Sequence, residues 1–388
     1  MTAGSTADTA AVAEEVRDAR SRGESLRIVG AGTWLDAGPL SSLRVSQTEL
    51  SSRAKSRDLH LTPLTGIVEY EPGDLVLTAR AGTSLAEIER TTAPEGQWLT
   101  LDPFGSESGT IGATMATASS GPLASAFGTT RDHILGCEFV AGTGDIVRTG
   151  GRVVKNVAGF DLVRMVTGAW GTLGVLTEIT VRLRARPAID RTFAVAVAGD
   201  TPAAVADAAW RFLRATEYSP LAAELLSPSL ARALGLEPSA GFLVRFGGSE
   251  TFVSAAIAAA KQLGVASEVP GSIWRGLSDA EPAGATVFRL SSLPSRIGDS
   301  WGRVLGLIEP FGGFAHASAS RGVVRCMLPA GAGLVSFSAL GEHATIVGER
   351  MPAELWNAIA TPRSSDALSH GIRKTFDPDG ILNPGLSP

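Results

Sequence analysis

The sequence predicts an α+β protein with at least two domains, and three observations carry this prediction. The chain has 388 residues, more than a single hydrophobic core usually supports. Its composition, 44% hydrophobic and 19% charged, supplies ample material for packed cores. From residue 192 onward, strand-like and helix-like runs follow one another in a β-α-β-β-α-β rhythm, which is typical of a compact domain with an antiparallel sheet.

The first half of the chain is predicted to alternate short strands and helices with glycine-rich turns between them. Residues 7–22 place aliphatic side chains at helical intervals, and Gly23 follows where a helix would stop. Residues 174–183 alternate apolar and polar side chains at period two, as a half-buried strand does. The other expected elements are strands over 26–29, 66–71, 75–79 and 98–101, a helix from Thr83, and a hairpin over 134–147.

The pattern of predicted strands and helices changes after Pro187, and we expect a domain boundary there. An alternating strand pattern over 192–199 is followed by a helix-like run over 203–215. A strand over 241–246 and a helix over 252–263 continue the pattern, which is expected to run to about residue 340. The last piece begins at Gly341.

Charge and cysteine content exclude several classes of protein. A net charge of −5 and a pI near 5.7 give no basic field for nucleic acid or an anionic bilayer. The N-terminus has no leader-like pattern and no apolar run is long enough to cross a bilayer, which favours a cytoplasmic protein and leaves docking to a membrane-bound partner open. The two cysteines, Cys137 and Cys326, are too few for an iron–sulfur cluster or a four-cysteine zinc site.

Two glycine-rich stretches are candidates for holding a phosphorylated cofactor. Gly30-Ala-Gly-Thr33 follows a predicted strand, and glycines there let backbone N–H groups approach phosphate oxygens. Residues 103–121 combine Gly109-Thr-Ile-Gly112 with a run of small residues, which could begin a helix whose first N–H groups face a pyrophosphate. A Rossmann fingerprint is absent, because Leu35 stands where the third glycine would be.

With these motifs the sequence resembles the flavin-binding oxidoreductases of the vanillyl-alcohol oxidase and p-cresol methylhydroxylase type. Within that family it is most like the smaller flavin-binding subunit of bacterial glycolate oxidase. The stretches that carry the resemblance are Gly30–Thr33, Thr110–Gly112, Gly128–Asp132, Gly151–Asp161, Gly171–Glu178, Gly341–Thr345 and Phe376–Gly385.

The resemblance implies a fold and a domain organisation. Residues 1–187 would form an FAD-binding domain of two α+β subdomains. Residues 188–340 would form an α+β cap domain with an antiparallel sheet, and residues 341–388 would return to the FAD domain. The cofactor would be FAD, held without a covalent bond, since neither His nor Cys occurs in residues 30–37.

The resemblance also implies which residues contact the cofactor. The pyrophosphate would be flanked by Gly30–Trp34 and Gly109–Ala113, and the flavin would lie by Ser119–Gly121 and Gly128. Val175 would contact the adenine side. The predicted cofactor-binding residues are Gly30, Ala31, Gly32, Thr33, Trp34, Pro103, Gly109, Thr110, Ile111, Gly112, Ala113, Ser119, Ser120, Gly121, Gly128 and Val175. No metal site is expected.

Oxidation of a 2-hydroxy acid needs a base for the hydroxyl proton and a cation for the carboxylate. His316 and His343 are the candidate bases, and a structural role is an open alternative for both. Candidates for the cation are Arg321, Arg325 and Arg373, because a guanidinium matches a carboxylate in shape.

The predicted function is an FAD-dependent oxidoreductase subunit that takes part in oxidising glycolate or a similar small 2-hydroxy acid to the 2-oxo acid. The expected partners are a larger homologous flavoprotein subunit and an iron–sulfur subunit that receives the electrons. Two alternatives stay open: an FAD-binding structural or electron-relay subunit that turns over no substrate, and a self-sufficient oxidase of an alcohol.

Overall fold

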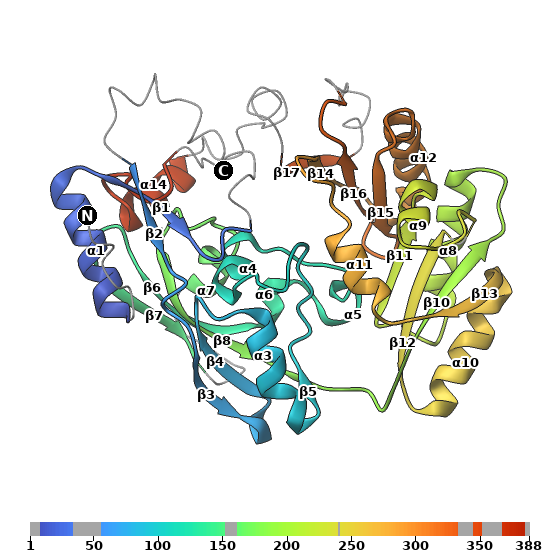
Figure 1. The fold of residues 1–388 in the computed structure, drawn as a ribbon, viewed down its shortest axis with the longest axis horizontal. Helices are drawn as coiled ribbons and strands as arrows, with labels where there is room; N and C mark the ends of the chain where they lie inside the picture. Colours follow the sequence, from blue (N-terminus) through green and yellow to red (C-terminus); the bar gives the residue numbers. More distant parts are fainter. Residues whose placement is uncertain are drawn as a thin grey trace. The chain divides into compact units, whose positions relative to one another are not determined.

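The structure, a computed structural model, describes residues 8–33, 56–151, 161–239, 241–332, 344–350 and 367–384. It divides into two compact units, which Figure 1 shows coloured along the chain. Unit 1 comprises Met1–Ser120, Gly128–Arg186 and Thr361–Pro388, and unit 2 comprises Gly121–Phe127 and Pro187–Ala360. The chain therefore passes between the units four times. Gly121–Phe127 belongs to unit 2 although it lies within the residues predicted for the first domain.

Unit 1 begins with helix α1 (Thr9–Arg22), which Asp8 caps at its N-terminus and Gly23, in the left-handed conformation, at its C-terminus. The strand β1 (Ser25–Val29) follows and pairs in parallel with β2 (Ser56–His60). Val12 and Val16 of α1 pack in a core with Leu26 and with Leu382 from the far end of the sequence. Leu26 also forms a parallel bridge to Leu382, so the C-terminal residues extend this small sheet.

The larger sheet of unit 1 has five strands and is antiparallel. Its order is β3 (Ile67–Glu71), β4 (Val76–Arg80), β8 (Val175–Arg182), β6 (Ile134–Val140) and β7 (Ile146–Gly150). A two-stranded piece pairs β5 (Gln97–Trp98) with β9 (Arg184–Ala185). The helices are α3 (Leu85–Thr92), α4 (Ile111–Thr117), α6 (Thr130–His133), α7 (Leu162–Val166) and α14 (Ala367–Phe376).

Unit 2 is built on an eight-stranded sheet whose strand pairs are all antiparallel. Its order is β13 (Gly264–Val269), β10 (Ile189–Val197), β12 (Phe242–Gly248), β11 (Ala222–Leu226), β15 (Phe314–Ser318), β16 (Val323–Leu328), β14 (Thr286–Ser291) and β17 (Thr345–Arg350). The helices are α5 (Ala124–Phe127), α8 (Pro202–Ala215), α9 (Pro228–Ala233), α10 (Glu250–Ala260), α11 (Ile273–Asp279) and α12 (Ile297–Ile308).

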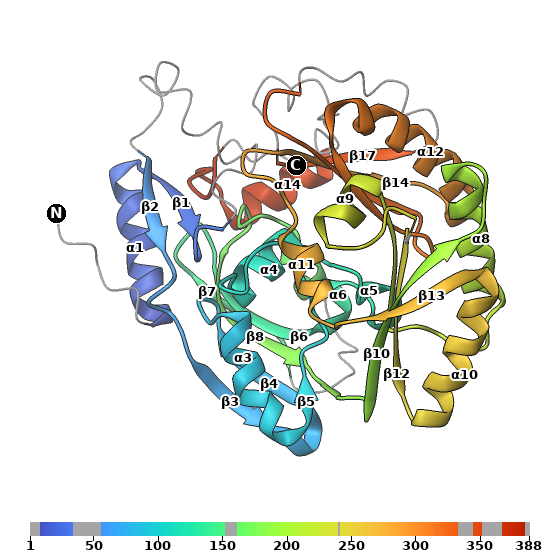
Figure 2. The ribbon, with the colours of Figure 1, turned by 45° about the vertical axis from the view of Figure 1, so that its right-hand side comes forward.

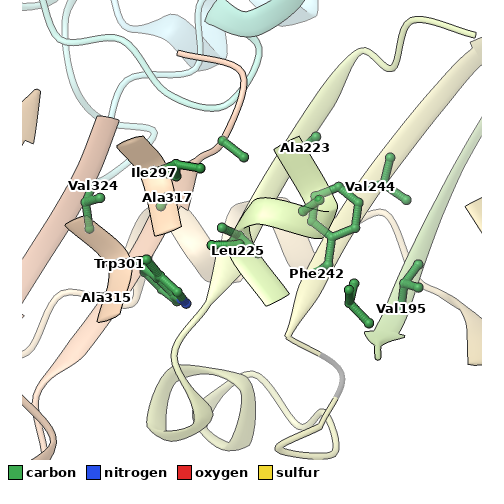
Figure 3. Close-up of a cluster of buried hydrophobic side chains, with 14 of the residues drawn as sticks. Val195, Ala223, Leu225, Phe242, Val244, Ile297, Trp301, Ala315, Ala317 and Val324 are labelled. Atoms are coloured by element: carbon green, nitrogen blue, oxygen red, sulfur yellow. The ribbon is translucent and has the colours of Figure 1, made fainter. Parts of the chain in front are cut away.

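The two faces of this sheet differ in chemistry. Helices α8, α10 and α12 lie on one side of the sheet (Figure 2). Their side chains bury that face in an apolar core, in which Trp301 and Phe242 are among the largest side chains (Figure 3). The alternate residues of the same strands point to the other face and include the buried polar residues Glu224, His316 and Arg325. One face of the sheet therefore packs in the apolar core, and the other face carries buried polar and charged side chains.

The predicted α+β class is confirmed by these mixed helices and antiparallel sheets. The strand predicted over 98–101 is wrong beyond Trp98, because β9 offers it only two partner residues. The rhythm predicted after residue 192 omits a helix, since α9 stands between β11 and β12.

Candidate functional site

Unit 1 contains an open pocket with a volume of about 90 Å³. Its lining is made mostly of glycine, alanine, threonine and aliphatic residues. They are Ile28, Val29, Gly30, Ala31, Gly32, Thr33, Leu61, Ala81, Thr110, Gly112, Ala113, Ala116, Thr117, Trp170, Gly171, Gly174, Leu176 and Asn383. Seven of the predicted cofactor-binding residues are therefore brought together: Gly30, Ala31, Gly32, Thr33, Thr110, Gly112 and Ala113.

The loop that leaves β1 offers hydrogen-bond donors to this pocket. Gly32 adopts φ +77°, a conformation that favours glycine. A Cβ atom on Gly30 would lie 2.9 Å from Oγ1 of Thr110, so only glycine fits there without a shift. No acceptor among the described residues takes a hydrogen bond from the backbone N–H of Gly30, Ala31 or Gly32. These three groups are available to phosphate oxygens.

Helix α4 contributes room rather than donors, which corrects the expectation that its first N–H groups face a pyrophosphate. The N–H of Ile111 donates to the carbonyl of Thr83 at 2.9 Å, and that of Gly112 donates to the carbonyl of Ala81 at 2.9 Å. The N–H of Ala113 donates to the side chain of its cap residue Thr110 at 3.2 Å. The first turn of α4 is therefore satisfied within the protein, and its small side chains leave the space open.

Another part of the pocket wall joins Trp170 and Gly171 to Asn383, which comes from the far end of the sequence. The side chain of Asn383 accepts a hydrogen bond from the N–H of Ile28 at 2.8 Å and donates one to the carbonyl of Trp170 at 2.7 Å. Gly171 adopts φ +72°, and a Cβ atom there would lie 2.9 Å from both the Ile28 and Asn383 side chains. These residues were not predicted, although the Gly171–Glu178 motif indicated this part of the chain.

Asp377 fastens the segment that carries Asn383. Its two carboxylate oxygens accept hydrogen bonds from the N–H groups of Ile381 at 3.1 Å and Leu382 at 2.9 Å. Burial raises the pKa of Asp377, and these hydrogen bonds oppose that rise. A buried carboxylate thus holds the tail in the position where Asn383 reaches the pocket.

The other predicted cofactor residues that the structure describes do not line this pocket. Val175 is fully buried in the core with α1, and Ile111 is buried in the core of the five-stranded sheet. Pro103 and Gly109 lie in the loop before α4, and Gly121 belongs to unit 2. Trp34 lies outside the described residues, as does most of the Gly151–Asp161 motif.

Ser119, Ser120 and Gly128 belong to a hydrogen-bonded loop instead. Thr130 donates from its hydroxyl to the carbonyl of Ser119 at 2.7 Å and from its N–H to the hydroxyl of Ser120 at 3.1 Å. Gly128 has φ +91° and lies against the Asp132 side chain, which accepts from the N–H of Thr129 at 2.8 Å. The motif Gly128–Asp132 therefore forms the N-terminal cap and first turn of α6.

Among the predicted catalytic residues, His316 has the most specific environment. Its Nδ1 lies 2.8 Å from Oε2 of Glu224, and the two residues are 3% and 2% exposed. Arg321 lies in the turn between β15 and β16 of the same unit, and Arg373 lies on α14 in unit 1. His343 is outside the described residues.

Arg325 is unsuited to the carboxylate-binding role considered for it, because its guanidinium is already occupied. It donates from Nη2 to Glu281 at 2.9 Å and from Nε to Glu349 at 2.7 Å, and its side chain is only 3% exposed. Burial opposes the ionised form of Glu349, but Arg325 and then Arg289 hold the pKa of this carboxyl below its ordinary value. In the described ranges, no three His, Cys, Asp or Glu side chains gather as a metal site.

Comparisons with known proteins bear on this pocket. Residues 5–150 match a family model described as an FAD binding domain. The chain is 45% identical over 124 residues to the glycolate oxidase subunit GlcE of Escherichia coli, covering 31% of this chain and 35% of that protein. It is 36% identical over 126 residues to the glycolate oxidase subunit GlcD of Bacillus subtilis, covering 32% and 27%. It is also 31% identical over 129 residues to a D-lactate dehydrogenase of Anaerostipes hadrus, covering 33% and 27%.

The matched region thus spans about a third or less of these relatives. A solved structure of alkyldihydroxyacetonephosphate synthase is similar over 97% of this chain and 74% of that one, with a TM-score of 0.68 and 16% identity. At that identity the likeness concerns the fold alone. The predicted fold type and the predicted cofactor, FAD, are confirmed by these matches.

Proposed function

Because the chain carries an FAD-binding domain in residues 5–150, we propose that it is a flavin-dependent oxidoreductase subunit that oxidises glycolate or a similar small 2-hydroxy acid to the 2-oxo acid. The observation that carries the proposal is the pocket of unit 1. Its Gly30 loop and its α4 wall both lie inside the matched domain, whose relatives include proteins named for glycolate and D-lactate.

The residues of the pocket fit the cofactor. The N–H groups of Gly30, Ala31 and Gly32 would hold phosphate oxygens, and the small side chains of α4 admit a wide group beside the backbone. When bound, FAD supplies the acceptor for the hydride that leaves the substrate carbon.

His316 is the proposed base for the hydroxyl proton. The Glu224 carboxylate at Nδ1 favours the tautomer with its proton on Nδ1, which makes Nε2 the basic nitrogen. The same carboxylate stabilises the imidazolium that forms when the proton arrives, as the orienting acid does in other histidine pairs.

We propose that the electrons then pass to an iron–sulfur partner, within an assembly that also holds a larger homologous flavoprotein subunit. Two relatives are themselves named as subunits. Both cysteines of this chain are buried, and burial raises the pKa of Cys137 to about 12, so neither is suited to ligate a cluster. Among the described residues, no helix combines the length and apolar character needed to span a bilayer.

The test begins with the colour of the purified protein and with its release by acid, which distinguishes non-covalent from covalent FAD. Anaerobic mixing with glycolate or D-lactate should then bleach the flavin absorbance in a single turnover, with dithionite as the control for a reducible flavin. A flavin that dithionite reduces but neither acid reduces, alone or with partner subunits, would contradict the proposal. Reduction only in the assembled complex would favour the electron-relay alternative.

A further inference from the structure

The segment Gly121–Phe127 packs in unit 2, although the chain on both sides of it belongs to unit 1. Its helix α5 contacts β11. The hydroxyl groups of Ser125 on α5 and Ser318 on β15 share a hydrogen bond of 2.9 Å. Among the described residues, the strand pairing of the eight-stranded sheet does not involve this segment. Its departure from unit 2 would therefore leave that sheet intact.

This segment lies on the face of the sheet that carries the His316–Glu224 pair. Ser318 and His316 are two residues apart on β15, and side chains with this spacing on a strand point to the same face. Glu224 lies on β11, the strand that α5 contacts. His316, Glu224 and Ser318 are 3%, 2% and 5% exposed, and Nε2 of His316 is buried. A substrate therefore cannot reach the proposed base while the covering residues stay in place.

The two ends of the segment are suited to movement. Gly121 is its first residue, and Gly128 follows its last residue with φ +91°. Glycine passes between positive and negative φ at little cost, and the hinges of mobile lids are a few loop residues that absorb such changes. Between the glycines, the helix Ala124–Phe127 is a single turn. The segment can therefore swing as a short unit.

We propose that Gly121–Phe127 is a lid, which opens to admit substrate to His316 and closes to exclude water during proton transfer. The role of His316 as the base rests on the proposed function, whereas its burial does not. Closure keeps the His316–Glu224 pair out of water, where the attraction that stabilises an imidazolium is stronger. Opening breaks the Ser125–Ser318 hydrogen bond, so loss of either hydroxyl should favour the open state.

The test measures the rate at which diethyl pyrocarbonate carbethoxylates His316 in the holoprotein, followed by peptide mass spectrometry. The reagent needs access to the ring but needs no turnover. S125A and S318A should each accelerate this reaction about fivefold, the equivalent of about 1 kcal/mol for one neutral hydrogen bond. The exposed His60 of β2 reports the reagent dose and should react equally in all variants. Equal rates at His316 in the wild type and both variants would overturn the inference.

Ser300 supplies the matched control. Its hydroxyl donates to the hydroxyl of Ser292 at 3.0 Å, a bond of the same kind, and it lies on α12 at the opposite face of the sheet. S300A should leave the reactivity of His316 unchanged. A rise equal to that of S125A would show that general loss of stability exposes His316, and would also overturn the lid.

A disulfide between the two serine positions should have the opposite effect. The Oγ atoms are 2.9 Å apart, so cysteines there are within reach of an S–S bond, and the native Cys137 and Cys326 are buried. Oxidised S125C/S318C should protect His316 from the reagent and slow flavin reduction by glycolate or D-lactate at least tenfold. The same variant, reduced with dithiothreitol and desalted, should regain both.

The two measurements separate the lid from the proposed function. Protection of His316 with unchanged flavin reduction would overturn the claim that substrate enters beneath the lid. A wild-type flavin that no 2-hydroxy acid reduces, with the expected reactivities of His316 in the serine variants, would overturn the proposed function and leave the opening of the segment standing.

Discussion

Asn383 and Trp170 are locked together by a hydrogen bond of 2.7 Å from the Asn383 side chain to the Trp170 carbonyl, and both residues adopt positive φ angles, 43° and 54°. Backbone in this region is strained for most residues and persists where the surroundings fix it. Here the surroundings are the wall of the pocket in unit 1.

N383G should weaken FAD binding without straining the backbone. Glycine accepts φ +43°, but the variant loses both side-chain hydrogen bonds, which we expect to lower FAD affinity about tenfold for about 1.4 kcal/mol. Flavin fluorescence recovered during dilution of the holoprotein measures the change. Unaltered FAD retention would show that Asn383 does not support the pocket.

G171A should release FAD, and G96A should not. Both glycines have similar positive φ angles, 72° and 63°, so both substitutions carry about 1–2 kcal/mol of backbone strain. The new methyl group of G171A would also meet Ile28 and Asn383 at 2.9 Å, whereas that of G96A meets nothing within 4 Å. The ratio of flavin to protein absorbance compares them, and equal FAD loss in the two variants would mean that strain alone is responsible.

E138Q should destabilise the protein near pH 7 and have less effect in acid. Burial opposes ionisation of Glu138, but hydrogen bonds from Thr9, Arg148 and Thr177 outweigh it and hold the pKa below its ordinary value. A lowered pKa contributes stability above the unfolded pKa of about 4.3, and that stability is lost as the pH falls through the folded pKa.

We expect E138Q to cost about 1–3 kcal/mol at pH 7, because buried hydroxyls lose their charged acceptor. Thermal unfolding at pH 7 and pH 4 measures the difference. R148Q removes only the exposed partner and should change Tm much less. A Tm difference that grows toward acid pH would contradict the argument.

E224Q should slow flavin reduction while leaving FAD bound. The amide cannot stabilise an imidazolium at His316 as the carboxylate does, so we expect the rate of reduction to fall about 100-fold, within the range typical of acid–base residues. Stopped-flow bleaching against substrate concentration separates this from weaker substrate binding. If the rate is unchanged, the His316–Glu224 pair is structural.

The sequence predicted most of the fold, because hydrophobic period and turn residues are local signals. The helix expected over residues 7–22 is observed as Thr9–Arg22, and the period-two run over 174–183 is the strand Val175–Arg182. The strand predicted beyond Trp98 is not observed, because the length of a strand depends on its partner strand elsewhere in the chain.

The candidate site was predicted where glycines signal it and missed where tertiary contacts create it. Gly30 and Gly112 were found because their spacing is visible in the sequence. Nothing near Asn383 indicates that its amide joins Ile28 to Trp170. The donors of α4 were assigned wrongly, since only the fold shows that Thr83 and Ala81 already accept from them.

The bridge between Leu26 and Leu382 has a consequence for how the protein is made. The N–H of Leu26 donates to the carbonyl of Ile381 at 2.7 Å, and the N–H of Asn383 donates back to Leu26 at 2.8 Å. A ribosome delivers β1 before unit 2 and these partners after all of unit 2. The small sheet, and the pocket wall to which Asn383 belongs, can therefore be completed only after unit 2 has been synthesised.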